Sequence, residues 1–362
     1  MTDNTFPVQA SQGTGDHTSQ MAAEIAMQPE ALARTLDTLL PLRPEIARLA
    51  EGRRWVLFIA RGSSDNASIC ARYLTEIHAG RSAALAAPSI PNLYGAKRDL
   101  SDTLAVAVSQ SGSTQEIVDA ASWAKECGAA TVAITNIADS PLARTADLAL
   151  ITQAGRELAV PATKTFTTQV AALSVLVDAL APTAGTLDAA FARVPEAAAA
   201  MLQTDGEVLD EMVEVLSKTD EVLSSGRGIT FGTTLEAALK LEETCLRPVR
   251  GLSYADLKHG PMAIVDAELA TLLVAAPEGP TLPGLIDLAN QIRSTGSPVL
   301  GIGGNGDFRE ACDLAVPGPD LPEALAPIVL PIPVQLMVER LARTLGLNPD
   351  APRGLKKVTQ TD

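Results

Sequence analysis

The sequence predicts an α/β protein made of two tandem units, each a parallel sheet flanked by helices on both faces. From residue 55 onward, short apolar runs alternate with helical stretches, a pattern typical of parallel sheets with crossover helices. The same succession then recurs at a nearly constant offset. A length of 362 residues also suits two or three domains of ordinary size.

The first unit is placed at residues 21–190, after a polar stretch over 1–20 that is predicted to be a disordered tail. Apolar residues over 21–49 follow the helical period, and Pro29 should kink or break that helix. Strands are expected at 55–60, 83–87, 103–108, 131–134 and 148–151. Helices are expected at 66–78, 115–127 and 165–180.

The second unit, at residues 200–345, is predicted from the internal repeat. Ala60-Arg-Gly62, which precedes a helix, recurs as Gly226-Arg-Gly228 before a predicted helix at 234–244. Gly128 and the strand after it recur as Gly296 and the strand at 299–302. Two copies indicate a duplicated domain and not a solenoid. A helical region at 187–216 joins them, and a tail at 346–362 follows.

The charge balance excludes several classes of partner. Lys and Arg number 28 against 43 Asp and Glu, which gives a net charge of −15. Nucleic acids and anionic membranes need a basic face, so we expect neither as a partner. No run suits a membrane span and the N-terminus lacks a signal peptide's apolar core, so a cytoplasmic location is expected.

The cysteines and histidines form no metal-binding pattern. No CxxC pair occurs, and the seven residues are widely scattered: Cys70, Cys127, Cys245, Cys312, His17, His78 and His259. We therefore expect reduced thiols and neither a metal nor an organic cofactor.

The segment Ser109-Gln110-Ser111-Gly112-Ser113-Thr114 lies between a predicted strand and a predicted helix. Ligands bind at the carboxyl ends of parallel strands, and the N–H groups of a helix N-terminus favour anions. We call this segment the serine loop. Its hydroxyls add donors, and Gly112 would let the backbone approach the ligand. Without a lysine or a GxGxxG pattern it favours a small phosphate ester. A capping box from Ser113 to Glu116 is compatible with that interpretation.

The equivalent loop of the second unit is Pro277-Glu-Gly-Pro-Thr281. Proline donates no N–H, and Glu278 would repel phosphate. Only the first unit is therefore predicted to bind the anion.

Three further groups are candidates for chemistry. Glu236 and Lys240 are four residues apart on a predicted helix, and the simple explanation is a solvated ion pair on its surface. The adjacent residues Glu242 and Glu243 cannot both face the same way, so one of them can face inward. His259 lies in a Gly/Pro-bounded loop and suits either proton transfer or a structural hydrogen bond. The C-terminal tail carries three cations: Arg353, Lys356 and Lys357. The tail is either a frayed end that aids solubility or a segment folded over an anion site.

Four separated motifs carry a family resemblance: the serine loop and the segments 161–169, 257–261 and 352–359, with the 24–29 stretch as a fifth likeness. Together they resemble tandem sugar-isomerase (SIS) proteins. The likeness is to the isomerase half of glucosamine-6-phosphate synthase and to the stand-alone, alternative glucosamine-6-phosphate deaminases. It covers residues 21–359.

The resemblance implies a role for each matching residue. The sugar phosphate would be held by Gly62, Ser64, Ser109, Gln110, Ser111 and Thr114. Glu243 is similar to the base that moves a proton between C1 and C2, and Lys240 to the lysine that keeps it ionised. Lys357 resembles a tail lysine that can form a Schiff base with a ketose. His259 resembles a ring-opening histidine from the neighbouring subunit, which implies a homodimer with a shared active site and the tail over that site.

This sequence differs from the synthases at two matching positions and lacks one of their domains. Arg61-Gly-Ser-Ser64 replaces a Cys-Gly-Thr-Ser loop, and Ala162 replaces a serine of the sugar pocket. No glutaminase domain or cysteine precedes Cys70. The expected activity is therefore glutamine-independent conversion of glucosamine 6-phosphate to fructose 6-phosphate and ammonia.

Three alternatives remain. The first two are a fructosamine-phosphate deglycase and an isomerase of another phosphorylated or sulfonated sugar. The third is a sugar-phosphate sensor, which the short, acidic N-terminal region disfavours because it cannot hold a helix-turn-helix domain.

Overall fold

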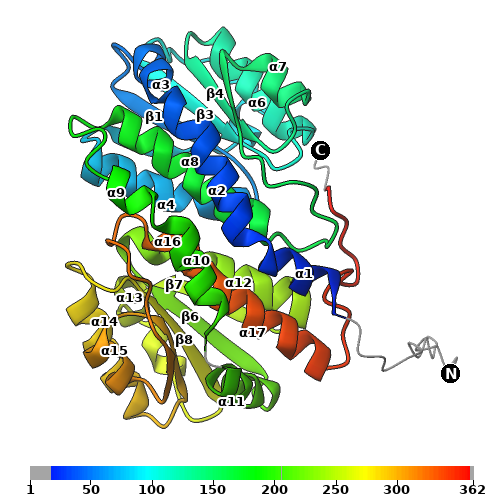
Figure 1. The fold of residues 1–362 in the computed structure, drawn as a ribbon, viewed down its shortest axis with the longest axis vertical. Helices are drawn as coiled ribbons and strands as arrows, with labels where there is room; N and C mark the ends of the chain where they lie inside the picture. The colour runs from blue at the N-terminus through cyan, green and yellow to red at the C-terminus, as the bar shows by residue number, and fades with distance from the viewer. Residues whose placement is uncertain (1–17, 205, 359–362) are drawn as a thin grey trace, which may run out of the picture.

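A computed structural model describes residues 18–204 and 206–358 of the chain. It contains two five-stranded parallel sheets, each with helices on both faces (Figure 1). The α/β class and the two tandem units expected from the sequence are thereby confirmed. The predicted disordered tail lies outside the described residues, except at its end, where Ser19 caps a helix that begins at Gln20.

The first sheet has the strand order β2-β1-β3-β4-β5, with every neighbouring pair parallel. Its central strand, β3, and the neighbouring β4 are buried along their whole length, as expected for a sheet covered on both sides. The strands are β1 Trp55–Ile59, β2 Ser82–Leu85, β3 Thr103–Val108, β4 Ala130–Thr135 and β5 Leu148–Ile151.

The second sheet has the order β10-β9-β8-β6-β7, again all parallel. Read from its other edge, this is the order of the first sheet with each strand replaced by its repeat, so the internal duplication is confirmed. The strands are β6 Glu221–Gly226, β7 Val249–Ser253, β8 Leu269–Ala275, β9 Val299–Gly303 and β10 Leu314–Val316.

Pro29 breaks the N-terminal helix as predicted. Helix α1 (Gln20–Ala26) ends before it, and α2 (Gln28–Leu39) begins with Pro29 in its first turn, where a missing N–H costs no hydrogen bond. A short 3-10 turn, Leu40–Leu42, leads into α3 (Arg43–Leu49).

The remaining helices follow the predicted alternation. Those of the first unit are α4 Ser63–His78, α5 Ser89–Asn92, α6 Gln115–Glu126, α7 Pro141–Thr145 and α8 Lys164–Leu180. The joining region holds α9 Asp188–Phe191, α10 Val194–Leu202 and α11 Gly206–Ser217. The second unit contains the 3-10 turns Gly228–Thr230 and Pro261–Ile264 with α12 Phe231–Cys245, α13 Tyr254–Lys258, α14 Leu282–Arg293, α15 Gly306–Ala311, α16 Ala326–Val329 and α17 Pro331–Thr344.

The two units share one core between their sheets. Helices α6 and α7 cover the outer face of the first sheet, and α14 and α15 cover the outer face of the second. Helices α4, α8, α12 and α17 fill the space between the sheets (Figure 1). Helix α12 packs directly on α4. Gly232 makes this possible, because a Cβ there would lie 2.2 Å from the carbonyl oxygen of Asn66.

Within the described ranges, none of the helices combines the length and the apolar character that crossing a bilayer requires.

Candidate active site

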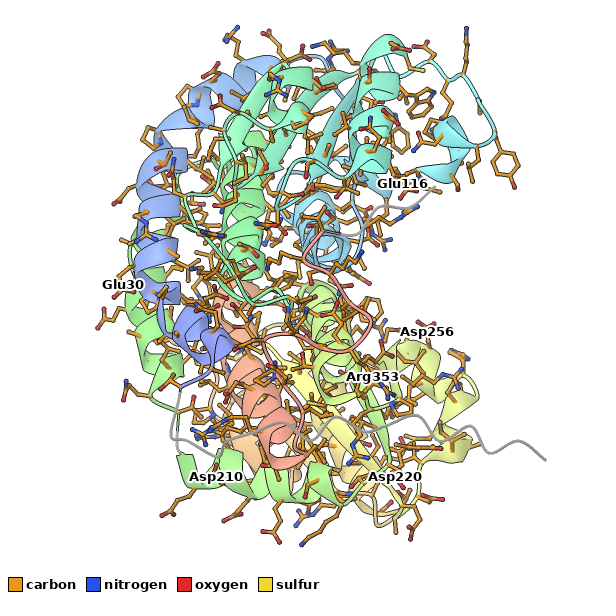
Figure 2. All side chains as sticks on the ribbon, turned by 90° about the vertical axis from the view of Figure 1, so that its right-hand side faces the viewer. Glu30, Glu116, Asp210, Asp220, Asp256 and Arg353 are labelled. Atoms are coloured by element: carbon orange, nitrogen blue, oxygen red, sulfur yellow. The ribbon has the colours of Figure 1, made fainter. Side chains whose placement is uncertain are left out.

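A cavity of about 350 Å³ opens where β1 and β3 end and α12 of the second unit approaches. Its walls come from five segments far apart in the sequence. They are the loop 61–64, the serine loop, the segment 160–165, the α12 residues Lys240 and Glu243, and residues 355–358 of the tail. Figure 2 views the molecule from this side, with Glu116 on the first unit and Asp256 on the second.

The predicted phosphate-binding residues all line this cavity: Gly62, Ser64, Ser109, Gln110, Ser111 and Thr114. Ser64 Oγ donates a hydrogen bond to Gln169 Oε1 at 3.1 Å. Ser111 Oγ accepts from Ser113 N–H and Oγ at 3.3 and 3.0 Å. Thr114 is the N-cap residue of α6, so the loop ends at a helix N-terminus, where N–H groups favour an anion.

Gly112 is required for packing within the protein. Its φ is +59°, and a Cβ there would lie 2.2 Å from Ser140 Oγ and 2.8 Å from Thr135 Oγ1. The absent side chain therefore lets the loop pack against Ser140. That Gly112 also lets the backbone approach a ligand stays a prediction.

Lys240 and Glu236 form a buried ion pair and not a solvated one. Their side chains are 1% and 2% exposed, and Lys240 Nζ lies 3.5 Å from Glu236 Oε1. The simple surface explanation fails because α12 lies between the two sheets, where this face contacts α4. Asn66 of α4 donates to Glu236 Oε2 at 2.9 Å.

Lys240 also forms an ion pair with Glu243. Burial alone would lower the pKa of Lys240, but the two carboxylates outweigh it and raise that pKa. For Glu236, burial dominates and raises the pKa in spite of Lys240. Lys240 therefore stays charged beneath the cavity floor.

Of the adjacent glutamates on α12, Glu243 faces the cavity and Glu242 faces outward. Glu243 is 25% exposed and lines the cavity, whereas Glu242 is exposed on the helix surface. The prediction that only one of the two points inward is confirmed. A carboxylate held by a buried lysine, with one side open to a cavity, is suited to accept a proton from a bound molecule.

The tail folds over the cavity instead of extending into solvent. Lys357 Nζ donates to Glu157 Oε2 at 2.6 Å and to the carbonyl oxygen of Ala159 at 2.8 Å. Glu157 is fully buried and also accepts from the N–H and hydroxyl groups of Thr163 and Thr165. Burial would raise the pKa of Glu157, but Lys357 and these donors lower it.

The sequence interpretation missed Glu157 and its support. Glu24 of α1 accepts from the N–H groups of Leu158 and Ala159 at 2.5 and 3.2 Å. The Asp350 carboxylate accepts from the first N–H groups of α1, and its carbonyl accepts from Val160 N–H at 2.8 Å. Segments 20–24, 157–160 and 350 thus interlock. The motif over 24–29 was the one signal of this contact, and nothing in it indicated a partner.

His259 is not brought to the site within one chain. It follows α13, is exposed, and does not line the cavity.

Among residues 18–204 and 206–358, no group of three His, Cys, Asp or Glu side chains is placed to hold a metal ion. The four cysteines are free thiols, and burial raises the pKa of Cys70, Cys245 and Cys312 to about 12.

The duplicated five-stranded sheets, with a hydroxyl-rich loop and a buried lysine–carboxylate pair at one cavity, define the class of tandem α/β sugar-isomerase proteins. The SIS domain family model matches residues 52–179. A protein of Silicibacter pomeroyi named provisionally as a phosphosugar isomerase is 34% identical, with a TM-score of 0.83 over 92% of this chain and 100% of that one. The chain therefore belongs to the SIS-domain phosphosugar isomerases.

Two further comparisons relate the chain to one branch of that family. The glutamine–fructose-6-phosphate aminotransferase (isomerizing) of Thermococcus kodakarensis is 31% identical over 93% of this chain and 57% of that protein. This chain thus spans somewhat more than half the length of such relatives. The C-terminal domain of glucosamine-fructose-6-phosphate aminotransferase from Francisella tularensis is 26% identical, with a TM-score of 0.82 over 95% of this chain and 100% of that domain.

Proposed function

We propose that the protein converts glucosamine 6-phosphate to fructose 6-phosphate and ammonia by aldose–ketose isomerisation. One observation carries the proposal: Glu243, held by Lys240, faces the same cavity as the serine loop and Lys357. In this proposal the phosphate of the sugar lies at the serine loop and its C1–C2 end lies at Glu243, since both line the same cavity. Relatives that act on fructose 6-phosphate by name support this substrate class.

The reaction needs one mobile proton and one water molecule. Glu243 removes the C2 proton of the open-chain amino sugar, and the C1 carbonyl becomes the hydroxyl-bearing carbon of an enolamine. Return of a proton to C1 leaves a C2 imine. Water adds to C2, the C2–N bond breaks, and ammonia leaves a ketone at C2. No electrons are exchanged, so the reaction needs no redox group.

Lys357 is placed to act at the C1–C2 end of the sugar. Its ammonium group is held by Glu157 and the Ala159 carbonyl at the cavity wall. From this position it can donate a hydrogen bond to the carbonyl oxygen of the ketose, or lose a proton and form a Schiff base with it. Because free ammonia is scarce under ordinary conditions, release of ammonia is the favoured direction.

We also propose a homodimer in which His259 of one copy completes the site of the other. His259 is exposed in the single chain and does not line the cavity of its own chain, so it is available to a second copy. Mixing Glu243→Gln and His259→Asn, each inactive alone, should restore about a quarter of the activity, because half of the dimers then hold one intact shared site. Absence of complementation by a mixed dimer would exclude the shared site.

The function is tested by incubating purified protein with glucosamine 6-phosphate and assaying ammonium and fructose 6-phosphate. They should appear in equal amounts, Glu243→Gln should abolish both, and Glu242→Gln should leave them unchanged. The same assay with a fructosamine phosphate and with aldose phosphates discriminates the deglycase and the other isomerases. Tight binding with no turnover of any of these would instead indicate a sensor.

A further inference from the structure

Arg61 occupies the cavity wall beside the serine loop, at a position where the resemblance leads one to expect a small cysteine. It follows β1 directly, lines the cavity, and its side chain is 45% exposed. Its Nη2 lies 2.8 Å from Glu116 Oε1. Glu116 is 8% exposed and belongs to the first turn of α6, the helix that begins where the serine loop ends. The guanidinium is therefore fixed at the same helix N-terminus as the proposed phosphate site.

Of the three other cations that line the cavity, Lys356 is an exposed residue of the tail, and the two lysines with buried or half-buried side chains are already engaged. Lys240 contacts Glu236 and Glu243, and Lys357 contacts Glu157. The serine loop itself contains no cation, and the protein as a whole carries a net charge of −15. A phosphate dianion entering this field needs a local positive charge. Arg61 is the cation that the first unit itself contributes to the lining of the cavity.

The ion pair with Glu116 leaves Arg61 able to bind a second anion. A guanidinium has five N–H donors in a planar fork, and the contact with Glu116 uses Nη2. The side chain is 45% exposed and lines the cavity. Because Glu116 already orders the side chain, little conformational freedom remains to be lost when a phosphate oxygen is bound.

We propose that Arg61 binds the phosphate group directly, bridging it to Glu116, and so sets the anion specificity of this chain. Glu116 is then a positioning residue, and its charge is neutralised by the same guanidinium. The inference rests on the proposed function only in requiring that the cavity takes a phosphate ester; it needs no particular sugar and no turnover.

The test measures the Kd of inorganic phosphate by isothermal titration calorimetry, together with thermal unfolding as a check on folding. Arg61→Met should weaken binding about tenfold or more, the loss expected for one charge-assisted hydrogen bond. Arg54→Met is the matched control: it removes one positive charge from another arginine–carboxylate pair, with Asp102, which does not line the cavity. It should change the Kd less than twofold.

The double variant Arg61→Met/Glu116→Gln separates direct binding from charge neutralisation. It keeps the net charge of the wild type and removes the buried carboxylate together with its guanidinium partner, so it should fold even if the single variant does not. We expect it to bind phosphate as weakly as Arg61→Met. Wild-type affinity in the double variant, or equal effects of Arg61→Met and Arg54→Met, would overturn the proposal for Arg61 and leave the proposed function intact. Wild-type protein that binds neither inorganic phosphate nor any sugar phosphate would overturn both.

Discussion

The ammonium nitrogen of Lys357 lies 2.6 Å from Oε2 of Glu157. This ion pair joins the C-terminal tail to a fully buried carboxylate. This contact turns the tail into one wall of the cavity. It also depends on α1, since Glu24 holds the N–H groups of Leu158 and Ala159. The site is therefore completed by both ends of the described chain, although its loops belong to the first unit.

Replacing Glu157 should free the tail. Glu157→Gln removes the charge that holds Lys357. Removing one partner of a buried ion pair typically lowers the free energy of unfolding by about 3–5 kcal/mol. We expect trypsin to cleave after Lys356 and Lys357 faster in this variant than in the wild type. Mass spectrometry of the digest over time measures the cleavage rates. Asp320→Asn, at an exposed pair with Arg193, is the matched control. Equal cleavage rates in the two variants would show that Glu157 does not hold the tail.

The same contact predicts a dependence of stability on pH. The folded-state pKa of Glu157 lies below its ordinary value, so its contribution is present above the unfolded pKa and is lost as the pH falls through the folded one. We expect the wild type to lose stability below about pH 4.5, the region of an unperturbed glutamate. Urea unfolding between pH 3 and pH 7 should show a shallower acid dependence for Glu157→Gln. Identical slopes would contradict the assignment.

The buried pair on α12 should be far more sensitive than a surface pair of the same spacing. Lys240→Met leaves Glu236 and Glu243 without their cation and should cost about 3–5 kcal/mol in the free energy of unfolding. Lys218 and Glu214 form an exposed i,i+4 pair, and Lys218→Met should cost about 1 kcal/mol or less. Urea titrations of both variants decide this. A loss of similar size at the two positions would mean that Lys240 is not buried as described.

Gly112 and Gly62 allow backbone strain and packing to be compared. Both have positive φ, but a Cβ at Gly112 meets Ser140, whereas at Gly62 nothing lies within 4 Å. Gly62→Ala should cost about 1–3 kcal/mol from backbone strain alone. Gly112→Ala should cost clearly more, and Gly112→Ala/Ser140→Ala should recover part of the difference in thermal unfolding. No recovery would contradict the close contact with Ser140.

Much of the fold follows from patterns that lie within short stretches of sequence. The strand predicted at 131–134 is Ala130–Thr135, and the helix predicted at 165–180 is Lys164–Leu180, because buried apolar periodicity extends over nearly the whole element. The helix predicted at 66–78 begins earlier, at Ser63. Its first turn is polar, since it faces the cavity, and therefore carries no apolar signal.

The site could be predicted only where its residues are neighbours in the chain. The serine loop was recognised because strand end, hydroxyls and helix start are contiguous. Glu157 and Glu24 were missed because each acts through a partner more than a hundred positions away, Lys357 and Leu158 respectively. The burial of Lys240 was also missed, since an i,i+4 pair looks the same on a solvated face as between two sheets.

The proton that Glu243 is proposed to remove can be followed directly. Glucosamine 6-phosphate deuterated at C2 is incubated with wild type, Glu243→Gln and Glu242→Gln, and the sugar is analysed by NMR as ammonium is released. We expect every ammonium released to be matched by loss of deuterium from C2 in the wild type and in Glu242→Gln, and neither to occur in Glu243→Gln. Ammonium release with deuterium retained at C2, or unchanged release by Glu243→Gln, would contradict it.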